Sequence, residues 1–228
     1  MSGIMMGYMA AAINTEITTG SLQFIQAESD YLVTPASSDW NLGTTWTIEF
    51  WLNMLYTSIG HAPGGIWGLI NQQGWTANNS INIAISDAKL VVGQGPTYND
   101  VRYTEPTPTQ WTQVAIVNAA GTQKVFYNGI EQTKVSGTFD TASYTNNIDD
   151  LYIGRLAPGY GSFIDGKMAM IRISNTAKYS TDFTPSTTYG VEADTVLFLG
   201  QSSPLVDTSS SAHVITNNGV TIDADFPA

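Results

Sequence analysis

Cysteine is absent from the 228-residue sequence. Disulfide bonds, thiolate nucleophiles and cysteine-ligated metal sites are therefore all excluded. The fold must depend on its packed core, and a chain of this length with 43% hydrophobic residues can bury a sizeable one.

Basic residues are also scarce, with 8 Lys and Arg against 19 Asp and Glu, which gives a formal net charge of −11. The first of them is Lys89. We expect no nucleic-acid partner, because neutralising phosphates requires clustered basic residues. The acidity favours solubility through self-repulsion; the alternative is that it attracts cations or a basic partner.

No apolar run is long enough to cross a membrane, and no membrane partner is expected. The segment Met1–Ala12 is apolar, but it lacks the positive start of a secretory signal and is broken by Gly. We expect residues 1–20 to form an N-terminal arm, in which Ile4–Ile17 packs on a neighbouring subunit or on the domain's own edge. A frayed terminus is the alternative. Residues 21–228 are expected to form one domain, since neither a repeat nor a low-complexity linker divides them.

Short stretches of alternating apolar residues, the period of a β-strand, run along the chain between turn residues. In the clearest, Trp46–Leu55, the even-numbered residues point one way and the odd-numbered residues the other, and we expect one face to be core and the other to be only partly wet. Asn128-Gly129 predicts a type I′ hairpin turn, and Ala177–Tyr179 a single helical turn. Without a convincing amphipathic helix, we predict an all-β fold of two packed antiparallel sheets. The predicted strands are 21–24, 31–34, 46–55, 66–71, 80–85, 89–92, 101–104, 111–117, 123–127, 130–135, 151–156, 167–174, 195–199 and 220–222.

Five motifs follow one another along the chain. They are a stretch ending in TIEFWL at Ser21–Leu52, WTQVAIV at Trp111–Val117, KVFYNGI at Lys124–Ile130, LYIGR at Leu151–Arg155 and FIDGKMAMIRISNTAKY at Phe163–Tyr179. In this order they resemble the concanavalin A-like lectin/glucanase superfamily, in its laminin-G-like branch. The resemblance implies a concanavalin A-like jelly-roll β-sandwich of two antiparallel sheets. The closing segment Asp194–Ile222 is similar to that of laminin-G-like proteins of phages and environmental viruses.

Two departures from the family pattern bear on function. Ala169 and Met170 stand where relatives often carry an acidic pair, and Gln113 stands where they carry His. The resemblance therefore does not bring an ion site to these positions. Other motif positions are expected to maintain the scaffold, among them Gly166, Ile171, Arg172 and Tyr179.

Catalysis is expected neither from the carboxylates nor from the histidines. The glucanase branch needs acids spaced as E-x-D-x-E or E-x-D-x-x-E on one strand face. Glu28-Ser29-Asp30 and Glu192-Ala193-Asp194 begin this pattern, but the third acid is missing from both. The only histidines, His61 and His213, are expected to be solvated loop residues; no G-x-S-x-G elbow accompanies them, and they are too few for zinc. We predict no enzyme, and assign no catalytic, cofactor-binding or metal-binding residue.

Calcium and sugar binding stay open. Calcium takes oxygen ligands from loops, and the alternative use of such residues is turn capping. A sugar site would need exposed aromatic side chains beside Asn, Asp or Gln; the alternative is an aromatic packed in an ordinary loop. The sugar candidates are Trp75 with Asn78 and Asn79, and Tyr98 with Asn99 and Asp100; the calcium candidates are Asn99, Asp100, Asp140, Asn146 to Asp150, and Asp165.

The first functional hypothesis is a non-catalytic structural protein of a virus particle, either a capsid decoration or cement protein or a tail or fibre component. It would act by protein–protein contacts with the major capsid or tail protein and by self-association into a homo-oligomer. The missing catalytic acids, the missing Cys, the apolar arm and the virus-like closing segment favour this hypothesis and a location in the virion. The alternative is an extracellular lectin-like module that binds cell-surface glycans.

Overall fold

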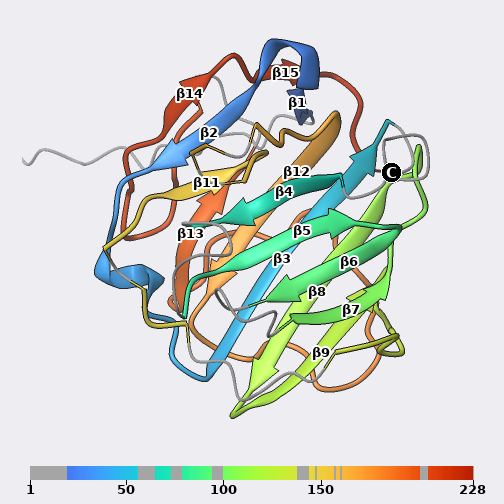
Figure 1. The fold of residues 1–228 in the computed structure, drawn as a ribbon. Helices are drawn as coiled ribbons and strands as arrows, with labels where there is room; N and C mark the ends of the chain where they lie inside the picture. The colour runs from blue at the N-terminus through green and yellow to red at the C-terminus, as the bar shows by residue number, and fades with distance from the viewer. Residues whose placement is uncertain are drawn as a thin grey trace, which may run out of the picture.

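The computed structural model describes residues 20–55, 65–72, 79–93, 100–137, 144–146, 148–156, 158–159, 161–200 and 205–227. Its strands form two antiparallel sheets that lie face to face as the layers of a sandwich (Figure 1). This arrangement confirms the predicted all-β jelly-roll class. Apart from Gly20, the arm predicted at residues 1–20 lies outside the described residues.

The described residues supply eight strands to one sheet, sheet A, and seven to the other, sheet B. The order in sheet A is β10 (Ile130–Glu131), β9 (Thr122–Tyr127), β8 (Thr112–Ala119), β3 (Thr45–Met54), β12 (Gly166–Ser174), β1 (Ser21–Phe24) and β15 (Thr221–Asp223), and β13 (Thr195–Leu199) also pairs with β12. The order in sheet B is β14 (Thr216–Asn218), β2 (Tyr31–Thr34), β11 (Leu151–Ile153), β4 (Ile66–Asn71), β5 (Asn82–Ser86), β6 (Lys89–Gly93) and β7 (Asp100–Thr104). Two short 3₁₀ helices, η1 (Gln26–Glu28) and η2 (Ser38–Trp40), join the first strands. Neither is long and apolar enough to cross a membrane.

The hydrophobic core lies between the two sheets. Because successive side chains of a strand point to opposite faces, the even-numbered residues of β3 share one face, as predicted, and the structure shows that this face is the one in the core. They are Trp46, Ile48, Phe50, Leu52 and Met54. The opposite layer is filled mainly by aliphatic side chains of sheet B, among them Leu32, Ile83, Ile85, Leu90 and Val92.

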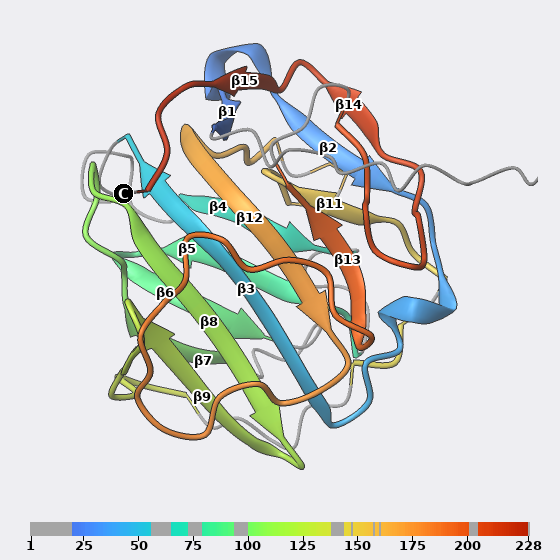
Figure 2. The same cartoon turned by 180° about the vertical axis from the view of Figure 1, so that it is seen from behind.

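The segment 175–192, here called the strap, connects β12 to β13 and crosses the outer face of sheet A (Figure 2). Its start is fixed to β3, where the Lys178 backbone N–H donates to Thr47 Oγ1 at 2.9 Å. Farther on, the Phe183 backbone N–H donates to the Gly129 carbonyl at 2.9 Å, in the turn between β9 and β10. The strap is thus held at both the centre and the edge of the sheet.

Aromatic packing closes the strap onto the sheet. The rings of Tyr179 and Phe183 stack with their centroids 3.6 Å apart, and both contact Phe126 on β9. The outer face of β3 is consequently buried, with Glu49 0% and Trp51 7% exposed. The expectation that this face would be partly wet is wrong, because its polar residues signal a second contact layer rather than solvent.

A bulge divides β12 into two halves. The register against β3 shifts between Ala169 and Arg172, and Met170 has a φ of 50°. Before the bulge β12 pairs with β1, and after it with β13. Ala169 and Met170 are fully buried beside Phe198 and Trp51. These two apolar residues, which stand where relatives often carry acids, belong to a small hydrophobic cluster under the strap.

Most predicted strand positions agree with the structure to within a few residues, and the Asn128-Gly129 turn has the expected positive φ at both positions, 48° and 78°. Two further expectations fail, and one strand was missed. Residues 177–179 form no helical turn, because their side chains and backbone bond to sheet A instead. The strand predicted at 130–135 ends at Glu131, and β14 was not predicted.

Candidate functional site

A buried ion pair joins β3 to β12 beneath the strap. Glu49 Oε1 lies 2.6 Å from Arg172 Nη2 and accepts a hydrogen bond from Arg172 Nε at 2.7 Å. Glu49 Oε2 accepts from the Tyr179 hydroxyl at 2.9 Å and from Gln113 Nε2 at 3.3 Å. The Arg172 guanidinium lies 4.5 Å from the centroid of the Tyr189 ring. The polar members of the motifs therefore fasten the strap, which is a scaffold function.

Two acids close to this ion pair, Glu192 and Asp194, also form ion pairs that hold the strap. Burial raises the pKa of Glu49, and the adjacent Arg172 opposes that rise. Lys178 Nζ lies 3.0 Å from Glu192 and 2.7 Å from Asp194. The hydrogen bond from Lys178 lowers the pKa of Glu192 below its usual value. The Glu192–Asp194 pair, which begins a glucanase-like pattern, thus anchors the strap.

His213 does not behave as the solvated loop residue that was expected. Its ring lies 4.5 Å from that of Trp40, its Nε2 is 3.2 Å from Asp39 Oδ2, and its side chain is only 10% exposed. The loop before β14 folds back on η2, which the sequence pattern does not reveal. In the other E-x-D pattern, the buried Asp30 accepts a hydrogen bond from the Ile25 backbone N–H at 2.9 Å. His61 lies outside the described residues.

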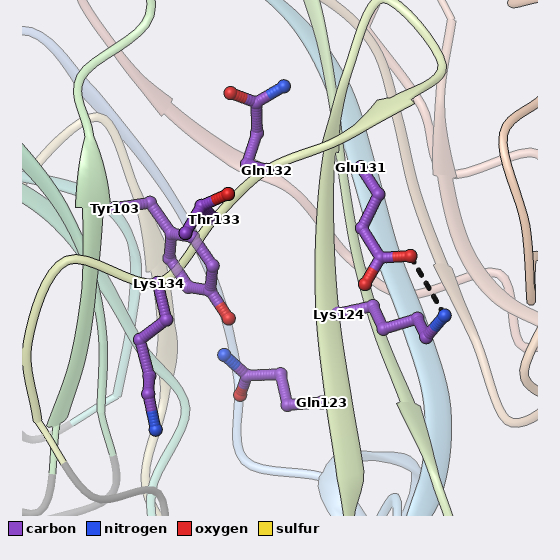
Figure 3. A pocket seen from close by; sticks show the side chains of 7 residues that line it. All are labelled: Tyr103, Gln123, Lys124, Glu131, Gln132, Thr133 and Lys134. Carbon is purple, nitrogen blue, oxygen red and sulfur yellow. Dashed lines mark hydrogen bonds and ion pairs between the residues drawn. The ribbon is translucent and has the colours of Figure 1, made fainter.

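A pocket of about 440 Å³, here called the rim pocket, opens where the edges of the two sheets meet (Figure 3). Tyr103 comes from β7 at the edge of sheet B, and Gln123 and Lys124 come from β9 of sheet A. Residues 131–134, from the end of β10 onward, complete the lining. Figure 3 shows the Tyr103 hydroxyl directed toward the Gln123 side chain.

Backbone hydrogen bonds hold the two sheets together beside the rim pocket. The Val135 backbone N–H donates to the Arg102 carbonyl at 2.8 Å, and the Arg102 N–H donates to the Ser136 carbonyl at 2.9 Å. The segment that leaves β10 is thereby attached to β7. The pocket is therefore framed by strands and by a fixed crossing segment.

The lining of the rim pocket is polar. Lys124 Nζ and Glu131 Oε2 form an ion pair at 2.8 Å, so these two charges compensate each other (Figure 3). Burial raises the pKa of Tyr103 above its usual value, and the hydrogen bond with the neighbouring Gln123 amide partly opposes this rise. Gln132 and Thr133 add an amide and a hydroxyl. Such groups donate and accept hydrogen bonds in the same small space, which suits a polyhydroxylated ligand.

The calcium candidates are only partly brought together. Asn146 Nδ2 donates to Asp149 Oδ2 at 2.6 Å, and Asp150 accepts from the Ala36 backbone N–H at 3.0 Å. Asp100 instead pairs with Arg102 at 2.9 Å. Within the described ranges no three His, Asp or Glu side chains are placed to share a metal ion. The candidates that lie outside those ranges are Asn99, Asp140 and Asn147.

The sugar candidates chosen from the sequence lie mostly outside the described residues, namely Trp75, Asn78, Tyr98 and Asn99. The structure instead assembles the rim pocket from residues that sequence reasoning did not select. Tyr103 and Gln123 lie on separately predicted strands, but nothing in the sequence tells that β7, the last strand of sheet B, and β9, next to the last strand of sheet A, lie on the same side of the sandwich. The approach of the two edges creates the pocket.

Comparison with protein families gives a clear assignment. The family model of the concanavalin A-like lectin/glucanases superfamily matches residues 26–182, more than half of the chain. The matched region contains β2 to β12, and with them most of both sheets. A comparison with curated proteins found no match.

Solved structures share the fold at low sequence identity. A proposed carbohydrate-binding protein from Bacteroides ovatus is 18% identical with a TM-score of 0.66; the match covers 92% of this chain and 61% of that one. A heptameric pentraxin from Limulus polyphemus is 10% identical with a TM-score of 0.56, over 91% and 96% of the two chains. Domains LG4-5 of the mouse laminin α1 chain are 12% identical with a TM-score of 0.50, over 76% and 49%. At these identities the likeness shows the fold alone.

Proposed function

The chain belongs to the concanavalin A-like lectin/glucanases superfamily, and from this premise we propose that it is a non-catalytic carbohydrate-binding module that acts outside the cell. The rim pocket carries the proposal. Its volume of about 440 Å³ falls within the usual range of ligand pockets, about 300 to 1,000 Å³. Three of the four acids in the glucanase-like patterns, Asp30, Glu192 and Asp194, serve as structural anchors, which is in keeping with binding rather than hydrolysis.

The hydrogen-bonding groups of the lining favour a sugar ring. Sugar hydroxyl groups both donate and accept hydrogen bonds, as do the amides of Gln123 and Gln132 and the hydroxyl of Thr133. The Lys124–Glu131 ion pair compensates two of the three charges in the lining, and the third is that of Lys134. The likeness to a Bacteroides ovatus protein proposed to bind carbohydrate supports the same function.

A panel of neutral glycans on an array, followed by titration of the best binder, tests this function. We expect Gln123→Ala and Tyr103→Phe each to weaken binding by about fivefold or more, since one net hydrogen bond contributes about 1 kcal/mol. Thr122→Ala, an exposed neighbour on β9, is the matched control and should bind as the unaltered protein does. Absence of binding to every glycan would refute the lectin function.

A second candidate is the role of a virion structural protein, which one surface feature favours. The side chains of Ile148 and Val214 are 81% and 69% exposed. Ile148 shortly precedes β11 and Val214 shortly precedes β14, and the first residues of both strands pair with the end of β2. Exposed aliphatic side chains at one end of the sandwich suit contact with another protein. The arm predicted at residues 1–20 would add to such a contact.

Native mass measurement separates this candidate from the lectin function. Ile148→Asp combined with Val214→Asp, and separately deletion of residues 1–17, should each prevent assembly without unfolding the domain. Ile222→Asp, at another exposed aliphatic residue, is the control. A single protomer in the unaltered protein, or normal assembly after both changes, would contradict the structural role.

A further inference from the structure

Arg155, the last residue of the LYIGR motif, lies in a cage of three aromatic side chains. Its guanidinium carbon is 4.6 Å from the ring centroid of Tyr31, 5.4 Å from that of Tyr152 and 5.0 Å from that of Phe163. Tyr31 and Tyr152 alternate with the core residues Leu32 and Ile153, so they point away from the core on the outer face of sheet B. All four members of the cage are partly exposed.

The backbone that carries Arg155 is fixed on both sides. Gly154, the residue before it, has a φ of 88°. The Arg155 backbone also packs closely on Gly68, where a Cβ atom would lie only 2.2 Å from the Arg155 carbonyl carbon. Arg155 forms a β-bridge with Phe163, and Asn71 Nδ2 donates to the Arg155 carbonyl at 3.3 Å. The position of the guanidinium is therefore built into the fold and does not depend on a freely moving loop.

No carboxylate among the described residues pairs with Arg155. Five of the 8 Lys and Arg residues form ion pairs with carboxylates, but Arg155 forms none within the described residues. Its Nε donates to the Leu156 carbonyl at 2.8 Å, and neither Nη group donates to a described residue. Asp150, whose charge acts on Tyr152 as that of Arg155 does, accepts a hydrogen bond from the Ala36 backbone N–H. The aromatic faces stabilise the cation while leaving its outer edge available.

We propose that the cage formed by Arg155, Tyr31, Tyr152 and Phe163 binds the carboxylate of an acidic saccharide. The two Nη groups of a guanidinium match the two oxygens of a carboxylate. A singly charged anion is favoured, because one cation must attract it against a net charge of −11. The partly exposed rings beside the cation offer apolar surface for the C–H groups of the sugar, which favours a saccharide over a bare carboxylate.

This site is separate from the rim pocket. The order of sheet B places β11 four strands away from β7, a distance of about 19 Å at about 4.8 Å per strand. The two sites also differ in chemistry, since one is a pocket lined by amides, hydroxyls and charged groups, and the other is a guanidinium among aromatic rings. The inference goes beyond the proposed function, and failure of either leaves the other standing.

Titration of the full chain with methyl β-glucuronide and with methyl β-glucoside, followed by NMR, tests the proposal. We expect the glucuronide to bind at least about tenfold more tightly, and its binding to shift the Tyr152 and Arg155 signals. The methyl ester of the glucuronide and N-acetylglycine, a carboxylate without a sugar, should both bind about as weakly as the glucoside. These comparisons need no altered protein.

Arg155→Gln should bring the affinity for the glucuronide down to that for the glucoside, and Arg155→Lys should retain an intermediate affinity. Lys89→Gln removes the same charge from another base that has no carboxylate partner among the described residues, and it should leave binding within about twofold. Equal affinity for glucuronide and glucoside overturns the proposal. Equal effects of Arg155→Gln and Lys89→Gln overturn it as well, and binding of N-acetylglycine as tight as that of the glucuronide overturns the assignment to a saccharide.

Discussion

Replacement of Arg172 by Met tests the role of the buried ion pair in closing sheet A. Arg172 is 2% exposed and Glu49 is 0% exposed, so Arg172→Met leaves a carboxylate without its cation in a site closed to water. Breaking a buried ion pair from one side costs about 3 to 5 kcal/mol. Against a typical domain stability of about 5 to 15 kcal/mol, this loss is a large fraction of the total.

A second substitution, combined with the first in a double-mutant cycle, tests whether the unpaired charge of Glu49 causes the loss of stability. Glu49→Gln removes the charge but keeps the shape and the ability to accept from the Tyr179 hydroxyl. The double variant should therefore be more stable than Arg172→Met alone, because the stranded charge is gone. If the ion pair were incidental, the two effects would simply add.

Chemical denaturation followed by tryptophan fluorescence gives the free energies of unfolding. Lys124→Met is the control, because its ion pair with Glu131 is partly exposed, with side chains 31% and 43% accessible, and should cost at most about 1 kcal/mol. A cost below about 1 kcal/mol for Arg172→Met, or a double variant less stable than Arg172→Met, would refute the reasoning.

Two further predictions concern a turn and the strap. Gly154→Ala should destabilise the fold by about 2 to 4 kcal/mol in thermal denaturation, since φ is 88° and a Cβ would lie 2.4 Å from the Phe24 ring; an unchanged Tm would contradict this. The hydrogen bond from Lys178 lowers the pKa of Glu192. The ionised Glu192 therefore contributes fully to the stability of the fold above its usual pKa of 4.5, and this contribution is lost as the pH falls below that value. The Tm should thus fall between pH 6 and pH 3, and the fall should be smaller in Lys178→Met; an equal fall in both proteins would exclude this contribution.

Most strands could be predicted because one physical pattern determines them. Trp46, Ile48 and Phe50 alternate with polar residues, and only a strand brings such residues to a single face. The Asn128-Gly129 turn was equally accessible, since few residue pairs tolerate positive φ at both positions. Local sequence was therefore sufficient to predict the strands, the hairpin and the fold class.

The strap could not be predicted because its partners are distant in the sequence. Glu49 lies 123 residues before Arg172 and 130 residues before Tyr179. The polar residues on the outer face of β3 were interpreted as partly solvent-facing, because alternation reports which side chains share a face and not what covers it. Residues 177–179 suggested a helical turn for the same reason, since their tertiary hydrogen bonds are invisible locally.

Contacts between residues that are distant in the sequence also decide which motif residues can form a binding site, although the motifs alone are enough to recognise the fold. Glu49 and Arg172 stand in the most distinctive motifs, yet their contacts show that these motifs maintain a closed sheet. Arg155 also stands in a motif, but it has no carboxylate partner among the described residues, and its cage needs Tyr31, which lies 124 residues earlier. A motif residue whose charge is satisfied within the fold stabilises it, whereas one left uncompensated is available to a ligand. That difference distinguishes Arg172 from Arg155, and it follows from their contacts and not from the residue type.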